Sequence, residues 1–320
     1  NLGQTSGTLV DAQKNEWDLF LDDLSLPKSI TPSQTNDTKT DPFAKKIVLL
    51  TGATGFLGIH LLYGLIQADW ATEVYCIVRA KDKKEGDQRL FKALSEAKMN
   101  LNDKEKLKIH VIIGDLNQNK LAISDSDYDQ ISNLVNVIIH AGAVVNSFLP
   151  YSAMRKVNAE GTQEILKLAC EGVTKSVHYI STMSVFPFGS VPVESTFSYP
   201  KDRPRHDASG YNLSKYAGEK KVAIAFKRKI PAFIYRPGFI GSATVTGHAN
   251  LNDFDNRFLS GCINMGSAPE GDIKLAITPV DIMAKDIISL IAYHEHSKEM
   301  PNAPPTHNFD NTHCLGCSYL

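Results

Sequence analysis

The sequence predicts an α/β fold, a Rossmann-type doubly wound parallel sheet with a smaller C-terminal substrate-binding subdomain. Two observations support this fold class. From Lys46 onward, short β-branched runs alternate with apolar positions at helical spacing, as in a parallel sheet covered by helices on both faces. The first run leads directly into a glycine pattern that opens a helix. With 320 residues and 42% hydrophobic content, the chain can bury a large core and carry a smaller appendage.

The expected elements follow from these patterns in chain order. Strands are predicted at residues 47–50, 74–78, 109–113, 135–139, 177–180 and 233–235. Helices are predicted at residues 57–67, 151–170, 211–228 and 280–293. Residues 297–320 are expected to be irregular.

Three parts are predicted along the chain. Residues 1–42 are expected to be a linker or N-terminal extension, because 31–38 has a linker composition, with a short helix at 17–26 packed on the domain. Residues 43–240 form the expected nucleotide-binding domain with the candidate catalytic groups. Residues 241–320 form the expected substrate-binding subdomain.

Composition narrows the class of partner. The formal net charge of -1 provides no field to attract nucleic acid or an acidic membrane, so neither partner is expected. No apolar run is long enough to span a bilayer, and the five cysteines are scattered, which together favour a soluble protein in a reducing cytoplasm. Cys314 and Cys317 form a CxxC without a second pair, so we interpret them as ordinary thiols and expect no metal.

A phosphate-binding cradle is predicted directly after the first strand. Glycines at 52, 55 and 58 permit a tight turn, close approach of the backbone to a pyrophosphate, and close packing of helix on strand. The alternative is a purely structural glycine turn. The candidate cofactor-binding residues of the cradle are Thr51, Gly52, Thr54, Gly55, Phe56, Leu57 and Gly58.

The end of the second strand indicates which dinucleotide is bound. Proteins that prefer NAD usually carry an acidic residue there, whereas this strand runs into Arg79, whose guanidinium favours a 2'-phosphate. Arg89, Lys81 and Lys83 are near enough in sequence to add positive charge. NADPH is therefore the expected cofactor, and the alternative is that these are solvated surface cations.

Further cofactor contacts are predicted where later strands end. Asp115 and Leu116 follow the third strand and are expected to face the adenine, and the small residues Ala141, Gly142 and Ala143 end the fourth. Asn146 is a candidate for the same wall or a local turn residue. Asn158 either supports Lys215 through a water or is a polar residue on a helix surface. Pro237 and Gly238 end the sixth strand.

Tyr211 and Lys215 are the predicted catalytic pair. Four residues apart, they share one face if the segment is helical. Hydride attack on a carbonyl builds an alkoxide that needs hydrogen-bond donors and a proton, which Tyr211 would supply. A phenol titrates near ~10, and the Lys215 cation is expected to bring that pKa towards neutrality. Thr182 is the expected second donor, with Ser181 and Ser184 as competitors.

Taken together, these residues resemble the terminal thioester reductase domains of nonribosomal peptide and polyketide synthetases. These domains belong to the extended short-chain dehydrogenases, and carboxylic acid reductases and aminoadipate reductase are related to them. The resemblance covers about residues 24–293. It rests on residues 48–58, 78–80, 89–90, 140–146, 179–182, 211–215, 236–238 and 278–281.

The resemblance implies a specific activity. Arg79 and Arg89 would grip the 2'-phosphate, and Thr182, Tyr211 and Lys215 would form a triad. The substrate would be an acyl or peptidyl thioester on the phosphopantetheine arm of a carrier domain immediately upstream, which fits the linker and the absence of an initiator Met. NADPH would reduce the thioester to a hemithioacetal that releases an aldehyde, and a second NADPH would give the alcohol. The family's substrate subdomain is larger than residues 241–320, so we expect this one to be incomplete.

Other interpretations remain. A reductase of free acyl-CoA or of a small carbonyl compound fits the same residues. Arg79 and the linker argue against a sugar-nucleotide epimerase, and the intact Thr182, Tyr211 and Lys215 argue against a non-catalytic dinucleotide sensor. The apolar residues of 254–263 form either an acyl channel or a core patch, and we favour the core patch.

Overall fold

The central sheet of the computed structural model is parallel. The structure describes residues 15–32, 44–186, 192–195, 209–270, 274–297, 301–309 and 315–316. Within these residues, a seven-stranded sheet has the order β10-β6-β5-β4-β1-β2-β3, and every neighbouring pair is parallel. Its strands are β1 (Lys46–Thr51), β2 (Ala71–Val78), β3 (Ile109–Ile113), β4 (Val137–His140), β5 (Ser176–Ile180), β6 (Ala232–Pro237) and β10 (Thr306–Phe309). The predicted α/β fold and its six strands are confirmed.

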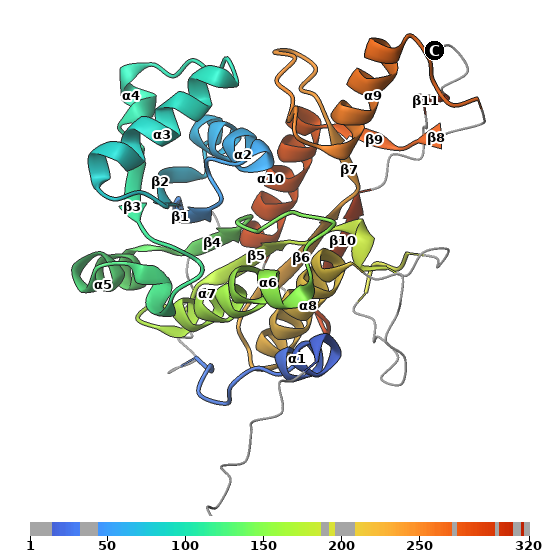
Figure 1. The fold of residues 1–320 in the computed structure, drawn as a ribbon. Helices are drawn as coiled ribbons and strands as arrows, with labels where there is room; N and C mark the ends of the chain where they lie inside the picture. Colours follow the sequence, from blue (N-terminus) through green and yellow to red (C-terminus); the bar gives the residue numbers. More distant parts are fainter. Residues whose placement is uncertain are drawn as a thin grey trace, which may run out of the picture.

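Helices cover both faces of this sheet (Figure 1). The α-helices are α1 (Glu16–Asp23), α2 (Phe56–Gln67), α3 (Lys83–Glu96), α4 (Asp103–Lys106), α5 (Asp125–Leu134), α6 (Tyr151–Arg155), α7 (Gly161–Cys170), α8 (Gly210–Lys227), α9 (Phe254–Met265) and α10 (Val280–His296). The predicted helix at 151–170 is observed as α6 and α7, joined by one π-helical turn, Lys156–Glu160. Short elements are η1 (Asn119–Ala122), η3 (Met183–Val185), β7 (Phe239–Gly241), β8 (Lys274–Leu275), β9 (Ile277–Pro279) and β11 (Leu315–Gly316).

Alternation along β1 explains why the sheet is buried on both sides. Val48 and Leu50 belong to a core cluster shared with α2 and α10, whereas Leu49, between them, belongs to a cluster shared with α7 and α8. Successive side chains of a strand point to opposite faces, so a continuous apolar run suits a strand covered by helices on both. A third cluster lies where α1 packs on α6 and α8.

The strand β10 corrects one sequence-based expectation. Residues 297–320 were expected to be irregular, yet Thr306–Phe309 pairs with β6 at the edge of the sheet. Its sequence, Thr-His-Asn-Phe, is short and half polar, so neither length nor alternation distinguishes it from a loop. The helix α10 also packs on α2, so part of the stretch 241–320 belongs to the main body. The boundary at 240 remains a prediction.

Some expectations concern residues beyond the described ranges. Most of the predicted linker at 31–38 lies outside them, as do Cys314 and Cys317. Cys76, Cys170 and Cys262 are described as buried free thiols. None of the described helices combines the length and apolar character needed to cross a membrane.

Candidate active site

A pocket of about 1290 Å³ lies at the carboxyl ends of the strands. The strand order reverses between β1 and β4, and ligands of open α/β sheets bind at such a switch point. The pocket contains most of the predicted site residues. These are Thr51, Gly52, Thr54, Gly55, Phe56, Leu57, Gly58, Arg79, Arg89, Asp115, Leu116, Ala141, Gly142, Ala143, Thr182, Tyr211, Lys215, Pro237 and Gly238.

The glycine cradle has no room for side chains. Gly52 has a positive φ of 76°, and a Cβ there would lie 2.7 Å from the backbone nitrogen of Gly142. A Cβ on Gly58 would lie 1.9 Å from the carbonyl oxygen of Gly52. Gly55 is the N-cap of α2, so the N–H groups of the first helical turn are available to an anion. This geometry fits the pyrophosphate of a dinucleotide.

A buried hydrogen-bond chain holds the strand ends behind the cradle. The Thr51 hydroxyl accepts from the Gly142 N–H at 3.0 Å and contacts His140 Nδ1 at 2.7 Å. His140 Nε2 lies 3.1 Å from the Thr162 hydroxyl, which donates to the carbonyl of Asn158 at 2.6 Å. Burial and the nearby Lys215 lower the pKa of His140 to about 3, so the ring is neutral near pH 7. Sequence reasoning missed His140, since only its proximity to β1 reveals the role.

Two guanidinium groups lie at one end of the pocket. Arg79 directly follows β2, and Arg89, on α3, donates to the carbonyl oxygen of Arg79. Both side chains are exposed, as a site for an entering phosphate requires. Lys83 instead pairs with Asp87 at 3.1 Å, and neither Lys81 nor Lys83 lines the pocket.

The predicted catalytic residues meet at the other end. Tyr211 and Lys215 lie on the first turns of α8, and Thr182 precedes η3. Lys215 is only 2% exposed, and its ammonium donates to the carbonyl of Ile180 at 2.7 Å. The side chains of Tyr211 and Thr182 are hydrogen-bonded. Thr182 also lies 2.9 Å from the hydroxyl of Ser184, so these hydroxyls form one donor group.

The electrostatics of this pair differ from the expectation. Burial raises the pKa of Tyr211 to about 12, and Asp253 contributes, although the bond with Thr182 opposes the shift. Burial lowers the pKa of Lys215 to about 7. The expected lowering of the Tyr211 pKa by Lys215 is therefore wrong for this structure, because burial removes water from around the phenol and raises its pKa. A protonated phenol is nevertheless the form needed to give a proton to a substrate.

Asn146 and Asn158 do not line the pocket. Asn146 accepts from the backbone N–H groups of Phe148 and Leu149, at 2.8 and 3.1 Å, and is thus a local turn residue and not part of the cofactor wall. Asn158 is 1% exposed, so its interpretation as a helix-surface residue is wrong. The side-chain amide of Asn158 accepts from the backbone N–H of Val144 and donates to the carbonyl oxygen of Val144. It also donates to the hydroxyl of Ser214, the residue before Lys215, at 2.9 Å.

The C-terminal part of the chain supplies walls that the sequence did not reveal. Asn250, Asn252 and Asp253 line the pocket, although in sequence they show only loop composition. Phe254 lines it as well and is 74% exposed, and Ile263 is 78% exposed. The favoured interpretation as a core patch is therefore wrong for Phe254 and Ile263, whereas Phe258 and Leu259, on the same helix, are half-buried.

A Rossmann sheet with a glycine cradle at its switch point, and a Tyr and a Lys four residues apart facing the pocket, define an oxidoreductase of the short-chain dehydrogenase/reductase type. The family model described as male sterility protein, an NAD-binding domain, matches residues 50–287. The chain belongs to this family, which is homologous to the terminal reductase domains of nonribosomal peptide synthetases.

Individual relatives agree with this assignment. A linear gramicidin synthase chain from Brevibacillus parabrevis is 38% identical over 280 residues, which is 86% of this chain and 5% of that protein. The aldehyde reductase lnaA from Aspergillus flavus is 34% identical over 84% of this chain and 26% of its own length. The crystal structure of the terminal R domain from the myxalamid PKS-NRPS pathway superposes with a TM-score of 0.82 at 34% identity, covering 95% of this chain and 75% of that one. The chain thus spans only a small part of the length of either curated relative.

Proposed function

We propose that this protein uses NADPH to release an acyl or peptidyl thioester reductively from the phosphopantetheine arm of a carrier domain, giving an aldehyde. One observation carries the proposal. A single pocket is lined by the glycine cradle after the central strand β1, by Arg79 and Arg89 after β2 on one side of it, and by Thr182, Tyr211 and Lys215 after β5 on the other. That separation suits a dinucleotide whose phosphates and reactive ring are recognised by different residues.

The residues present fit NADPH. At Gly52, Gly58 and Gly142 an added Cβ would clash with neighbouring protein atoms, so only glycine lets the backbone of the cradle approach a pyrophosphate closely. Arg79 and Arg89 would pair with the 2'-phosphate, and Lys215 would hold the nicotinamide ribose. When bound, the reduced nicotinamide supplies a hydride. Asp115 and Leu116 would contact the adenine end.

The chain's own groups would manage the carbonyl oxygen and the proton. Thr182 and Tyr211 would hold the thioester oxygen as negative charge develops on it. Tyr211, protonated near pH 7, would give that oxygen its proton while the carbonyl carbon gains the hydride, which yields a hemithioacetal. Breaking the carbon–sulfur bond then returns the thiol to the carrier and leaves an aldehyde. A second NADPH would reduce the aldehyde to an alcohol.

The substrate class is inferred from the relatives and from the pocket wall. One relative is a linear gramicidin synthase, and a solved neighbour is the terminal reductase domain of a PKS-NRPS pathway. The exposed aromatic side chains of Phe239 and Phe254 line the pocket and offer an apolar surface to an acyl group. The protein would act in the reducing cytoplasm, where its buried thiols remain free.

The test is a comparison of NADPH consumption with one acyl group presented on a carrier domain and on CoA, each repeated with NADH. The proposal predicts fastest turnover with NADPH and the carrier-bound thioester. Faster turnover with CoA would favour an acyl-CoA reductase, and no turnover with either thioester would contradict the proposal. The Tyr211→Phe variant should lose turnover yet keep NADPH binding, because the phenol hydroxyl transfers the proton but contributes little to NADPH affinity.

A further inference from the structure

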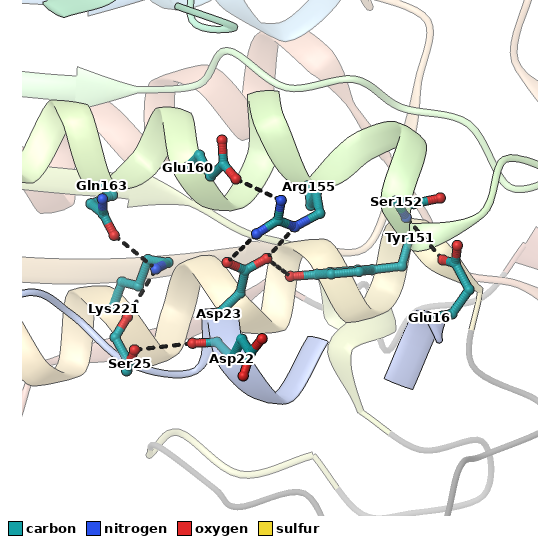
Figure 2. Close-up of polar contacts among 10 residues, drawn as sticks. All are labelled: Glu16, Asp22, Asp23, Ser25, Tyr151, Ser152, Arg155, Glu160, Gln163 and Lys221. Carbon is teal, nitrogen blue, oxygen red and sulfur yellow. Dashed lines mark hydrogen bonds and ion pairs between the residues drawn. The ribbon is translucent and has the colours of Figure 1, made fainter. Parts of the chain in front are cut away.

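The N-terminal segment forms a strap, residues 15–31, along the back of the catalytic helix. Its helix α1 packs on α6 and α8. Figure 2 shows the polar contacts that fasten it, with Asp23 at their centre. Phe20 packs its ring against Tyr151 and Tyr216, at centroid distances of 5.7 and 6.0 Å. The strap therefore contacts α8 at Tyr216, directly after Lys215 in the sequence.

The carboxylate of Asp23 is the strap's main polar anchor. It is buried, with only 6% of the residue exposed, and three donors satisfy it. Tyr151 donates its hydroxyl at 2.6 Å, and Arg155 donates from Nε at 2.8 Å and from a terminal nitrogen at 3.0 Å. Burial and the Asp23 carboxylate both raise the pKa of Tyr151, which keeps this hydroxyl a donor. A bidentate pair of this kind fixes the plane of the Arg155 guanidinium.

Arg155 passes this constraint to the π-helical turn. Its remaining terminal nitrogen pairs with Glu160 at 2.7 Å, so the salt bridge spans the whole turn, Lys156–Glu160. π-helical turns are rare and occur mostly as single turns inside α-helices, frequently at functional sites. The turn places Asn158, whose amide donates to the Ser214 hydroxyl beside Lys215. A continuous set of contacts thus leads from Asp23 to the catalytic helix.

A second set of contacts fastens the strap further along α8. Lys221 donates to the carbonyl of Ser25 at 2.8 Å and to Gln163 at 3.1 Å. Arg228 donates to the carbonyls of Leu26 and Ile30, at 2.8 and 3.0 Å. These bonds hold the strap after Asp23, so loss of the Asp23 pair would release the π-helical turn without detaching the strap.

We propose that Asp23 is a positioning residue for Tyr211 and Lys215, acting through Arg155 and the π-helical turn. The strap is then part of the catalytic unit and not a passive connection. A displaced turn moves Ser214 and with it the side chains of Tyr211 and Lys215. Small displacements of groups at a reacting centre lower the reaction rate strongly. Because its kinetic readout is turnover, this role rests on the proposed function.

The experiment compares Asp23→Asn with Asp22→Asn, the same chemical change at an exposed position one residue earlier. Turnover is expressed per NADPH site, counted by binding stoichiometry, so that unfolded protein does not contribute. Asp23→Asn is expected to lower kcat about tenfold to a hundredfold with little change in the Kd for NADPH. Asp22→Asn should match the wild type. Equal kcat in the two variants would overturn the proposal.

Hydrogen exchange provides a readout that needs no turnover. In Asp23→Asn, amides of 156–160 and 211–219 should exchange faster, whereas those of β1 should not change. Uniform acceleration, or none, would overturn the positioning role. If Asp23→Asn does not fold, Arg155→Lys keeps the charge but removes the bidentate pair with Asp23 and the simultaneous pair with Glu160. Wild-type kcat and exchange in that variant would overturn the proposal. If the wild type shows no turnover but Asp23→Asn shows the expected local change in exchange, only the proposed function is contradicted.

Discussion

At the scale of single residues, burial shifts the pKa values of Tyr211 and Lys215 in opposite directions. The phenol of Tyr211 is held protonated by a pKa of about 12, whereas the ammonium of Lys215 has a pKa of about 7. Near neutral pH the tyrosine is therefore a proton donor, and the lysine is the group that titrates.

The pH dependence of activity should follow Lys215. Its pKa is depressed by burial, so the ammonium is present below about 7 and is lost as the pH rises through that value. If the ammonium holds the nicotinamide ribose, kcat/KM should fall above neutrality. A pH profile of kcat/KM for NADPH at saturating thioester measures this, and a rate that is constant until the phenol ionises would assign the alkaline limb to Tyr211 instead.

Cofactor preference should depend on Arg79. Replacing it with Ala removes a charge-assisted hydrogen bond, and we expect the KM for NADPH to rise about 10- to 100-fold while the KM for NADH changes little. Lys83→Ala is the matched control, because Lys83 pairs with Asp87 outside the pocket. An equal loss with both cofactors would show that Arg79 does not read the phosphate.

Residue types in local motifs were predictable, whereas side-chain direction was not. The cradle glycines and the pair Tyr211 and Lys215 lie at the pocket because a strand, a turn or a helical turn dictates their position. Asn158 turns inward because of a π-helical turn, which no periodicity reveals. The pKa of Tyr211 depends on its burial and on the charge of Asp253, which is distant in the chain, so it cannot be read from its neighbours in sequence.

At the scale of elements, the turn between β1 and α2 carries the tightest packing. Gly58→Ala would place its Cβ 1.9 Å from the Gly52 carbonyl oxygen, so the turn must open. We expect a loss of roughly 1–3 kcal/mol in unfolding free energy and of most NADPH affinity. Calorimetry and cofactor titration measure both quantities.

A glycine in open space provides the control for that substitution. At Gly261, on α9, no atom lies within 4 Å of an added Cβ, so Gly261→Ala should be neutral or stabilise the helix by up to about 1 kcal/mol. If Gly58→Ala is tolerated equally well, the cradle is not tightly packed.

Strands with continuous apolar runs were predictable from sequence as well, whereas β10 was not, because its pairing with β6 is a tertiary contact.

At the scale of the whole molecule, three histidines link stability to pH, of which His60 and His140 are buried and His294 is half-buried. Burial first, and then nearby groups, lower the pKa of His60 to about 4 and of His294 to about 4, and burial and Lys215 lower that of His140 to about 3. The unfolded chain, with histidine pKa values near ~6.5, binds more protons than the folded chain below that pH. Stability is therefore full above about 6.5 and is lost as the pH falls towards the folded values.

We expect the unfolding free energy to fall between pH 7 and pH 5 by on the order of 1–2 kcal/mol for each such histidine. Urea unfolding at several pH values measures this. Equal or greater stability at pH 5 would mean that these rings are hydrated in the folded protein.

The proposed reaction transfers hydride from NADPH to a carrier-bound thioester. The most direct measurement uses NADPH deuterated at the hydride-donating carbon, followed by mass spectrometry of the released product and the carrier. We expect an aldehyde with deuterium on its carbonyl carbon, or the alcohol derived from it, together with a free phosphopantetheine thiol. A released acid without deuterium, or a thioester that remains on the carrier while NADPH is bound, would contradict it.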